Sequence, residues 1–316
     1  MIVRRALAAL VAGSAVLVGV PQAATAAPDT LRTYVLPGRA VFPEGVAVLG
    51  GFYYATSTNG GAVYRGDLRD RRAEVFLPAG QNGRTVAVGI KATASRLVVA
   101  GGDTGLVSVY NRRTGERVAQ FTNNASKADP TFVNDVAIAP NGDAYVTDSF
   151  RPVLYRIPAA QLAHPMAGRQ RLPVFRTFAR TPLNYQPGFN VNGIVATSDG
   201  RFVIVGQSNT GKLYRIRLHD KLVTQLDLGG VRLTGNDGLV LLESRVLYVV
   251  RNSVEKIAEV RLSVAYGSGR VVSVTGDRDF QTPTTAAVAG DRLLVVNSQF
   301  NGPGQPPFTL TSIPLP

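Results

Sequence analysis

Four stretches of this sequence place an oxygen-bearing polar side chain directly before a short apolar run. These polar residues are Glu44 (before Gly-Val-Ala-Val), Asn134 (before Asp-Val-Ala-Ile), Asn192 (before Gly-Ile-Val-Ala) and the pair Asn236 and Asp237 (before Gly-Leu-Val-Leu). Together they supply two carboxylates and two or three amide carbonyls, which are hard oxygen donors. If the fold brings them together they suit Ca²⁺, which takes about 6–8 oxygen ligands, some of them water. The residue types therefore predict a divalent-cation site whose cofactor is Ca²⁺ or another hard divalent cation.

The composition excludes softer metal chemistry and several common catalytic mechanisms. The chain has no cysteine, which rules out thiolate metal sites, disulfides and a Cys nucleophile. The two histidines, His164 and His219, are too few for a three-His zinc site and lie away from the polar positions. No nucleophile-elbow, zincin, P-loop, EF-hand or dinucleotide motif occurs. Any catalysis must therefore depend on carboxylates, amides and hydroxyls.

The polar residues belong to a repeated unit of about 45 residues. Six copies begin near Phe42, Thr85, Phe132, Asn190, Thr234 and Thr282. Each copy contains short runs rich in Val, Ile, Leu and Tyr, separated by Gly, Asn or Asp turns, which is the pattern of β-hairpins. A four-stranded unit of this length cannot bury both faces alone, and radial stacking of six units would. The sequence thus predicts an all-β, six-bladed β-propeller of four-stranded antiparallel blades.

The two ends of the repeat region predict how the ring closes. The sixth copy has only three strands, whereas residues 31–36 form a spare strand before the first copy. We expect this N-terminal strand to pair into the last blade. One longer spacing, between the third and fourth copies, predicts an inserted loop over residues 161–186. Residues 27–316 are predicted to form one propeller domain.

A propeller would bring the polar residues together, because the innermost strands begin around the central axis. The alternative at each position is an Asn or Asp that only shapes a turn by bonding backbone amides. Four such positions in separate blades favour a shared cation site, with Asn236 as a further candidate ligand. Asp148 and Asn297 are instead predicted to cap hairpins.

These motifs resemble those of a known family. FPEG around Glu44, FVNDVAIAPNGDAYVTDS around Asn134, NVNG around Asn192 and GNDG around Asp237 occur in the order and blade positions of regucalcin/gluconolactonase-like (senescence marker protein type) six-bladed propellers. The second motif is also similar to the strand unit of NHL and YVTN propellers. The resemblance implies a secreted bacterial-type member in which Glu44, Asn192 and Asp237 hold a divalent cation and Asn134 contacts substrate or metal. It further implies that the cation polarises the carbonyl of a sugar lactone and that Asp237 is the general base for the attacking water.

The first 26 residues have the pattern of a secretory signal peptide. Arg4 and Arg5 precede an apolar run over residues 6–20 and then Ala24-Thr-Ala26, after which we expect cleavage. The run is shorter than the ~20 residues of a transmembrane helix, and no later segment is long enough. A secreted or cell-envelope protein without a transmembrane anchor is predicted; an uncleaved anchor and twin-arginine export are the alternatives.

The chain is basic, with 34 Lys and Arg against 21 Asp and Glu and a formal net charge of +13. Its basic residues are scattered and lack the interleaved aromatic residues that a groove for single-stranded nucleic acid needs. We therefore expect a solvated basic surface, no nucleic-acid partner and a monomer.

Two classes of function are compatible with these features. The first is an exported, Ca²⁺-dependent hydrolase of the lactonase or ester type that acts on a small molecule, with residues 161–186 shaping its pocket. The second is a non-catalytic propeller that binds an envelope polymer, a peptide or a small ligand and uses the cation structurally. Non-hydrolytic chemistry of the strictosidine-synthase-like kind rests on shared shape alone. Chelator-sensitive turnover would distinguish the first class from the second.

Overall fold

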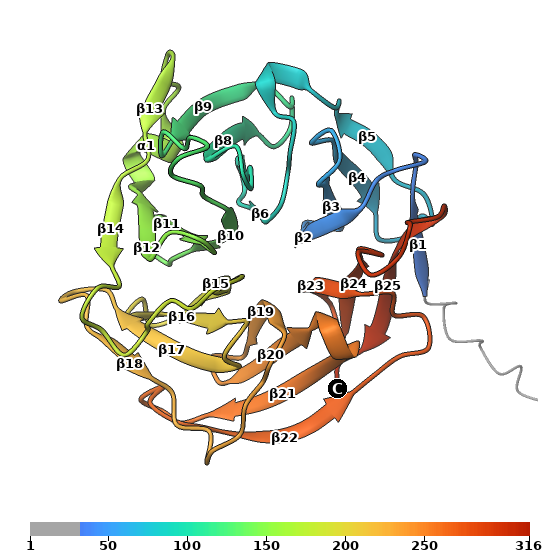
Figure 1. Cartoon of the computed structure of the whole chain (residues 1–316). Coiled ribbons are helices and arrows are strands. Elements are labelled where there is room, and N and C mark those ends of the chain that lie inside the picture. The colour runs from blue at the N-terminus through green and yellow to red at the C-terminus, as the bar shows by residue number, and fades with distance from the viewer. Residues whose placement is uncertain (1–31) are drawn as a thin grey trace, which may run out of the picture. The chain divides into compact units, whose positions relative to one another are not determined.

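The computed structural model describes residues 32–316, so the predicted signal peptide over residues 1–26 lies outside the described residues. The described residues form 25 strands in six sheets, which follow one another around a central axis (Figure 1). The first strand of each sheet contacts the first strand of the next, so these strands line the axis. The fold is a six-bladed β-propeller, as the repeats predicted.

Each blade runs from its inner strand to its outer edge. Blade 1 contains β2 (Pro43–Leu49), β3 (Phe52–Ser57), β4 (Val63–Asp67) and β5 (Glu74–Leu77). Blade 2 contains β6 (Ile90–Ala92), β7 (Arg96–Ala100), β8 (Leu106–Asn111), β9 (Arg117–Thr122) and β13 (Arg169–Arg171). Blade 3 contains β10 (Val133–Ile138), β11 (Ala144–Asp148), β12 (Val153–Ile157) and β14 (Val174–Thr177).

The second half of the ring repeats this plan. Blade 4 contains β15 (Val191–Ala196), β16 (Phe202–Gln207), β17 (Lys212–Arg217) and β18 (Val223–Gln225). Blade 5 contains β19 (Asn236–Leu242), β20 (Val246–Arg251), β21 (Lys256–Leu262) and β22 (Gly269–Thr275). Blade 6 contains β23 (Pro283–Ala289), β24 (Arg292–Asn297), β25 (Phe308–Pro314) and β1 (Thr33–Leu36). The helical segments are α1 (Ala159–Ala163) and the 3₁₀ turns η1 (Gln81–Gly83) and η2 (Asn252–Val254).

The hairpins follow from the local sequence. The middle strands are rich in β-branched and aromatic residues, and β16 is buried along its whole length because neighbouring blades cover both faces. Gly142, Gly200 and Gly290 have φ angles of 86°, 68° and 65° at turns between the first and second strands. Glycine adopts this left-handed conformation without steric cost. The apolar core therefore lies between successive blades.

Residues near both ends of the described chain share blade 6. Thr33–Leu36 pairs antiparallel with residues 308–311. Arg32 adds ion pairs to Asp277 at 2.6 Å and to Asp279 at 2.7 Å. The predicted closure of the ring by the N-terminal strand is confirmed.

The predicted loop over residues 161–186 is wrong in part. It contains the end of α1 and two short strands: β14 completes blade 3, and β13 pairs parallel to β9 at the edge of blade 2. The sequence did not reveal β13 because Arg169–Arg171 is an Arg-Gln-Arg run with no apolar residue. Buried Leu172 and Phe175 anchor the segment to the blades.

Candidate functional site

A β-bulge interrupts strand pairing near the start of five inner strands. The shifts fall between Pro43 and Val46, Val133 and Val136, Val191 and Ile194, Asn236 and Leu239, and Pro283 and Ala286. Two residues lie inside each bulge, and a bulge redirects side chains away from regular alternation. The first bulge residues are Glu44, Asn134, Asn192, Asp237 and Thr284. The four predicted polar residues are thus structurally equivalent.

Close packing of the inner strands explains the glycine that follows three of these residues. A Cβ on Gly193 would lie 2.1 Å from the carbonyl oxygen of Asp237, and one on Gly45 would lie 2.4 Å from that of Val88. Gly238 is equally confined. Only glycine lets the backbones of adjacent blades approach this closely at the axis.

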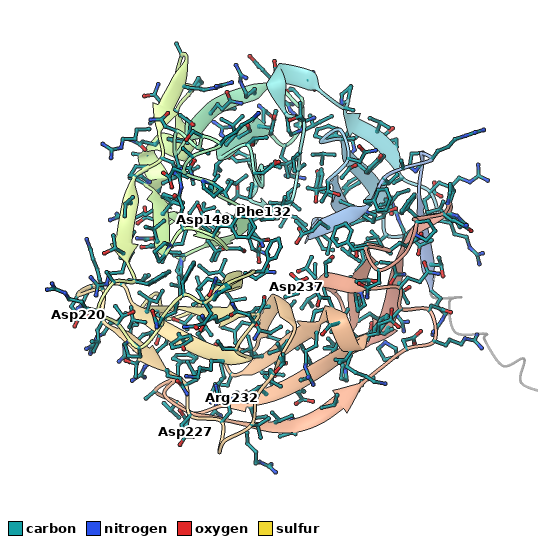
Figure 2. All side chains as sticks on the ribbon, viewed as in Figure 1. Phe132, Asp148, Asp220, Asp227, Arg232 and Asp237 are labelled. Carbon is teal, nitrogen blue, oxygen red and sulfur yellow. The ribbon has the colours of Figure 1, made fainter. Side chains whose placement is uncertain are left out.

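The bulges bring the four predicted residues to one cavity. Glu44, Asn134, Asn192 and Asp237 line a cavity of about 410 Å³ at the end of the channel where the inner strands begin. All four are buried, with exposed fractions of 8%, 2%, 7% and 4%. Figure 2 shows Asp237 near the middle of the ring.

Asn236 lies outside this group. Its Nδ2 donates hydrogen bonds to the carbonyl oxygens of Gln207 (3.1 Å) and Leu233 (3.0 Å), and the side chain does not line the cavity. Its Oδ1 lies against Gly206 in blade 4 and, like that of Asn134, is buried without a hydrogen-bond partner, but it faces blade 4 and not the cavity. Asn236, predicted as a further cation ligand, therefore joins blades 4 and 5 and shapes the local backbone.

The two carboxylates of the cavity are held in an unfavourable environment for negative charge. Burial, together with the charges of Asp237 and Asp135, raises the pKa of Glu44 well above its usual range. Burial also raises the pKa of Asp237 to about 7, although a hydrogen bond from Asn252 acts in the opposite direction. No lysine, arginine or histidine of the described chain lines this cavity. A positive charge there would offset the cost of burying both carboxylates.

Asn252 is a site residue that the sequence did not reveal. Its Nδ2 donates a 2.6 Å hydrogen bond to Asp237 Oδ2, and it lines the same cavity. It follows the second strand of blade 5, as Thr58 does in blade 1 and Ser208 in blade 4, and both of these also line the cavity. The polar residues that follow the second strand in blades 1, 4 and 5 were the pattern that could have indicated these additional cavity residues.

Lys91 and Asp135 form a charged pair deeper in the channel that the sequence also did not reveal. Lys91 Nζ lies 3.8 Å from Asp135 Oδ1. Asp135 occupies the second bulge position of blade 3, where its Oδ1 accepts the backbone N–H of Val136 and its Oδ2 accepts that of Ile194 in blade 4. Burial raises the pKa of Asp135, and Lys91 opposes that rise. This carboxylate therefore has partners that Glu44 lacks.

Three phenylalanines complete the cavity wall. Phe132, Phe189 and Phe300 line it, and Phe189 and Phe300 are 45% and 44% exposed. Phe150, 39% exposed, packs on Phe189 with ring centroids 4.9 Å apart. We call Phe132, Phe150, Phe189 and Phe300 the aromatic rim.

The hairpin caps that the sequence predicted are confirmed. Asp148 Oδ1 accepts the backbone N–H groups of Phe132, Phe150 and Arg151. Asn297 Oδ1 accepts the backbone N–H of Gln281. Neither side chain lines the cavity.

The remaining predicted features lie away from the cavity. The side chain of His219 is 73% exposed beside Asp220, which Figure 2 shows at the outer edge of the ring. His164 follows α1 at the periphery. None of residues 161–186 lines the cavity, so the expectation that they shape the pocket is wrong. The segment contacts residues beside the cavity through Tyr185, whose hydroxyl donates to the carbonyl oxygen of Asp148 at 2.6 Å, and through Gln186, whose backbone N–H donates to Asn190 Oδ1 at 2.8 Å.

The donor set fits a hard divalent cation. Among residues 32–316 no three His, Cys, Asp or Glu side chains are grouped to hold a metal, so any site must combine the two carboxylates with amides. Asn134 Oδ1 is buried and has no hydrogen-bond partner, while its Nδ2 donates to Ser149 Oγ at 2.9 Å. A buried carbonyl oxygen without a donor is costly, and a cation would satisfy it. Glu44, Asn192 and Asp237 would be the other protein ligands.

A larger cavity lies beside this site and has little chemistry of its own. It has a volume of about 620 Å³ and is lined by the loop between β24 and β25, with Glu255 as its charged residue. Among the described residues that line this larger cavity, Glu255 is the charged group and no second acid or base is present. The channel cavity is therefore the better candidate for a functional site.

Comparison with known proteins supports the fold and does not identify a family. No protein-family model matches the chain, and no curated protein matches it by sequence. Solved structures do match. They include the major allergen Mala s 1 of Malassezia sympodialis (TM-score 0.67, 14% identity, 89% of this chain and 96% of that chain) and luciferin-regenerating enzyme (TM-score 0.61, 12% identity, 90% and 92%). Virginiamycin B lyase from Staphylococcus aureus also matches (TM-score 0.59, 13% identity, 84% and 81%). At these identities the likeness concerns the fold.

Among residues 32–316, no helix has both the length and the apolar character that crossing a bilayer requires.

Proposed function

We propose that this protein is an exported, Ca²⁺-dependent hydrolase of lactones or esters. The observation that carries the proposal is the convergence of Glu44, Asn134, Asn192 and Asp237 from four blades on one cavity. Two buried carboxylates and an unpartnered amide oxygen gather there without a basic side chain lining the cavity in the described chain. This arrangement costs free energy unless a cation occupies it.

Each residue has a role in the proposed reaction. Glu44, Asn192 and Asp237 would hold the cation, which supplies Lewis-acid polarisation of the substrate carbonyl when bound. Asn134 would contact the cation or the substrate. Water would add to the carbonyl carbon while its proton passes to the Asp237 carboxylate. The C–O bond would then break as Asp237 returns this proton to the leaving oxygen, which gives an acid and an alcohol, joined in one molecule when the substrate is a lactone. Asn252 would keep the Asp237 carboxylate in place through Oδ2.

Two further observations support this proposal. The four residues match the positions that the regucalcin/gluconolactonase resemblance assigns to its cation site. Two of the solved structures with this fold are named as enzymes, a luciferin-regenerating enzyme and a lyase, so the fold supports catalysis in other proteins. Export is proposed from the signal-peptide pattern of residues 1–26.

The test is calorimetric titration of CaCl₂ into chelator-stripped protein, followed by a panel of lactones and aryl esters on the loaded form. We expect saturable binding near one site per chain and turnover that EDTA abolishes. Asp237→Asn should lose both, whereas the matched variant Asp220→Asn, at the outer edge of the ring, should keep both. Turnover by Asp237→Asn at the wild-type rate would overturn the mechanism.

The non-catalytic propeller is the second candidate, and the aromatic rim favours it as much as it favours catalysis. Three phenylalanines lining a cavity can retain an apolar ligand without any reaction. Calcium binding and ligand binding without turnover of any lactone or ester would support this second function.

A further inference from the structure

The exposed phenylalanines of this protein are concentrated at the channel cavity. Within residues 32–316, phenylalanines with a large exposed fraction are Phe52, Phe150, Phe189 and Phe300, and the last three belong to the aromatic rim. Exposed aromatic rings are unfavourable in water, and their grouping at a cavity marks a surface for an apolar ligand. The rim is therefore a feature of the site that the hydrolytic residues alone do not explain.

The rim approaches the cavity from two sides of the ring. Phe132 and Phe150 belong to blade 3 and Phe189 lies two residues before β15 of blade 4, whereas Phe300 follows β24 of blade 6. Blades 3 and 4 lie across the ring from blade 6 in Figure 1. Phe300 is stacked on Phe42 of blade 1 with centroids 6.5 Å apart. An apolar group in the cavity would thus have an aromatic wall on each side.

The side of the rim formed by Phe132, Phe150 and Phe189 is held in a fixed arrangement. The rings of Phe132 and Phe189 meet edge to face with centroids 5.2 Å apart, and Phe132 and Phe150 are 5.8 Å apart. The fully buried carboxylate of Asp148 accepts the backbone N–H of both Phe132 and Phe150 at 3.0 Å. Preorganised aromatic surfaces bind ligands with a smaller entropic cost than mobile ones.

The charge of the cavity limits the charge that a ligand can carry. Its lining includes two carboxylates and no basic side chain within the described chain, so no side chain there would pair with an anionic substrate, and the two carboxylates balance the charge of the proposed Ca²⁺. Hydroxyl and amide groups of Ser208, Asn209 and Ser253 lie on the wall formed by blades 4 and 5. The ligand that fits is neutral, with one polar group toward the inner strands and an apolar body at the rim.

We infer that the site takes uncharged lactones or esters with an aromatic or long alkyl substituent, which lies between Phe189 and Phe300, in preference to polyhydroxylated sugar lactones. The hydrolytic part of this inference rests on the proposed function, and the recognition of the apolar body does not. Phe189 and Phe300 are the residues that determine specificity.

The experiment compares three neutral lactones on the Ca²⁺-loaded protein: dihydrocoumarin, δ-valerolactone and glucono-1,5-lactone. We expect kcat/KM to be highest for dihydrocoumarin. Phe189→Ala and Phe300→Ala should each lower it about tenfold for dihydrocoumarin, because truncation removes much of the apolar contact, and less than about threefold for δ-valerolactone. Phe52→Ala, an equally exposed phenylalanine at a distant hairpin, is the matched control and should change neither value.

A second measurement separates recognition from turnover. The lactam analogue of dihydrocoumarin, 3,4-dihydroquinolin-2-one, is titrated calorimetrically into wild type and the three Phe variants. Binding of the lactam that Phe189→Ala and Phe300→Ala weaken about tenfold, without hydrolysis of any lactone, would support the apolar recognition and overturn the hydrolase. A preference for glucono-1,5-lactone, or equal loss on all three lactones in the rim variants, would overturn the inference and leave the hydrolase standing. Absence of both turnover and lactam binding would overturn both.

Discussion

The two ends of the central channel are built from the same six strands and have opposite chemistry. Where the inner strands begin, carboxylates, amides and the aromatic rim line a cavity of about 410 Å³. Farther along the same strands a second cavity of about 370 Å³ is lined by apolar residues such as Val46, Ala137 and Leu239, with Lys91 as its charged residue. One end therefore presents polar oxygen atoms and aromatic rings to the channel, and the other presents mainly aliphatic side chains.

The β-bulge separates these two regions. Within it, the inner strand is freed from regular pairing with its neighbour, and a polar side chain can turn to the axis without breaking the alternation that buries the core. After the bulge, regular pairing resumes at Val46 and Val136. From there on, the side chains of the strand alternate between the neighbouring blades and the channel. A propeller can thus change its site residues without disturbing the blades, because the bulge confines the change to two positions.

The largest effect is expected from removing a charge at the polar end. Glu44→Gln should reduce kcat/KM for a neutral lactone by about a thousandfold, because the cation that stabilises charge in the transition state would be bound weakly. Initial rates at a fixed Ca²⁺ concentration that just saturates the wild-type protein measure this. Val48→Thr, at the apolar end, is the control and should retain activity; an equal loss in both variants would mean that the two ends are not functionally distinct.

The next-largest effect is expected from substituting a glycine of the bulge, and it should appear as a loss of folding stability. Gly193→Ala would place a methyl group 2.1 Å from the Asp237 carbonyl oxygen and force adjacent backbones apart. We expect the free energy of unfolding to fall by about 3 kcal/mol, measured by urea denaturation. Gly302→Ala, in open space, should be close to neutral. Equal stability of the two variants would contradict the close approach of the blades.

A smaller effect is expected at the charged pair between the two ends. Lys91→Met would leave the buried Asp135 carboxylate without its ion-pair partner and should cost about 2 kcal/mol of unfolding free energy, less than for a fully buried pair because Lys91 is partly exposed. Adding Asp135→Asn should recover part of this loss. If the single variant is as stable as wild type, the pair contributes no stability.

The smallest effect is expected for the histidines. His164→Ala and His219→Ala should change unfolding free energy by less than about 0.5 kcal/mol and leave hydrolysis unchanged, because both residues lie at the periphery. Parallel melting curves and lactone assays measure this. A large loss of activity in either variant would show that the reaction does not take place in the channel cavity.

The sequence predicted what depends on periodicity and missed what depends on tertiary packing. The repeat of hairpins was sufficient to predict the six blades and the closing strand Thr33–Leu36. It was also sufficient to predict the four polar residues that occupy equivalent bulges. Equivalent positions in different repeats can be recognised in the sequence, because each repeat is formed by consecutive residues.

The site residues that the sequence did not predict correctly have a common physical cause, which is their dependence on contacts between blades. Lys91 lies in the three-residue strand β6, where no polar residue marks the start of the unit. Phe189 and Phe300 come from connecting segments, and their meeting at one cavity depends on the ring rather than on any single repeat. Asn236 has the residue type of a ligand, but its position one residue before the bulge directs it between blades.

Pairing of β1 with β25 joins two segments that are separated by almost the whole chain. Contacts between such distant residues slow folding, because chain entropy is lost before the contact stabilises the fold. Until β25 exists, the edges of β1 and β24 that it will join have no partner, and unpaired strand edges associate readily with other chains. A nascent chain is therefore most vulnerable to aggregation just before β25 is available, when every residue that lines the cavity at the axis has already been synthesised.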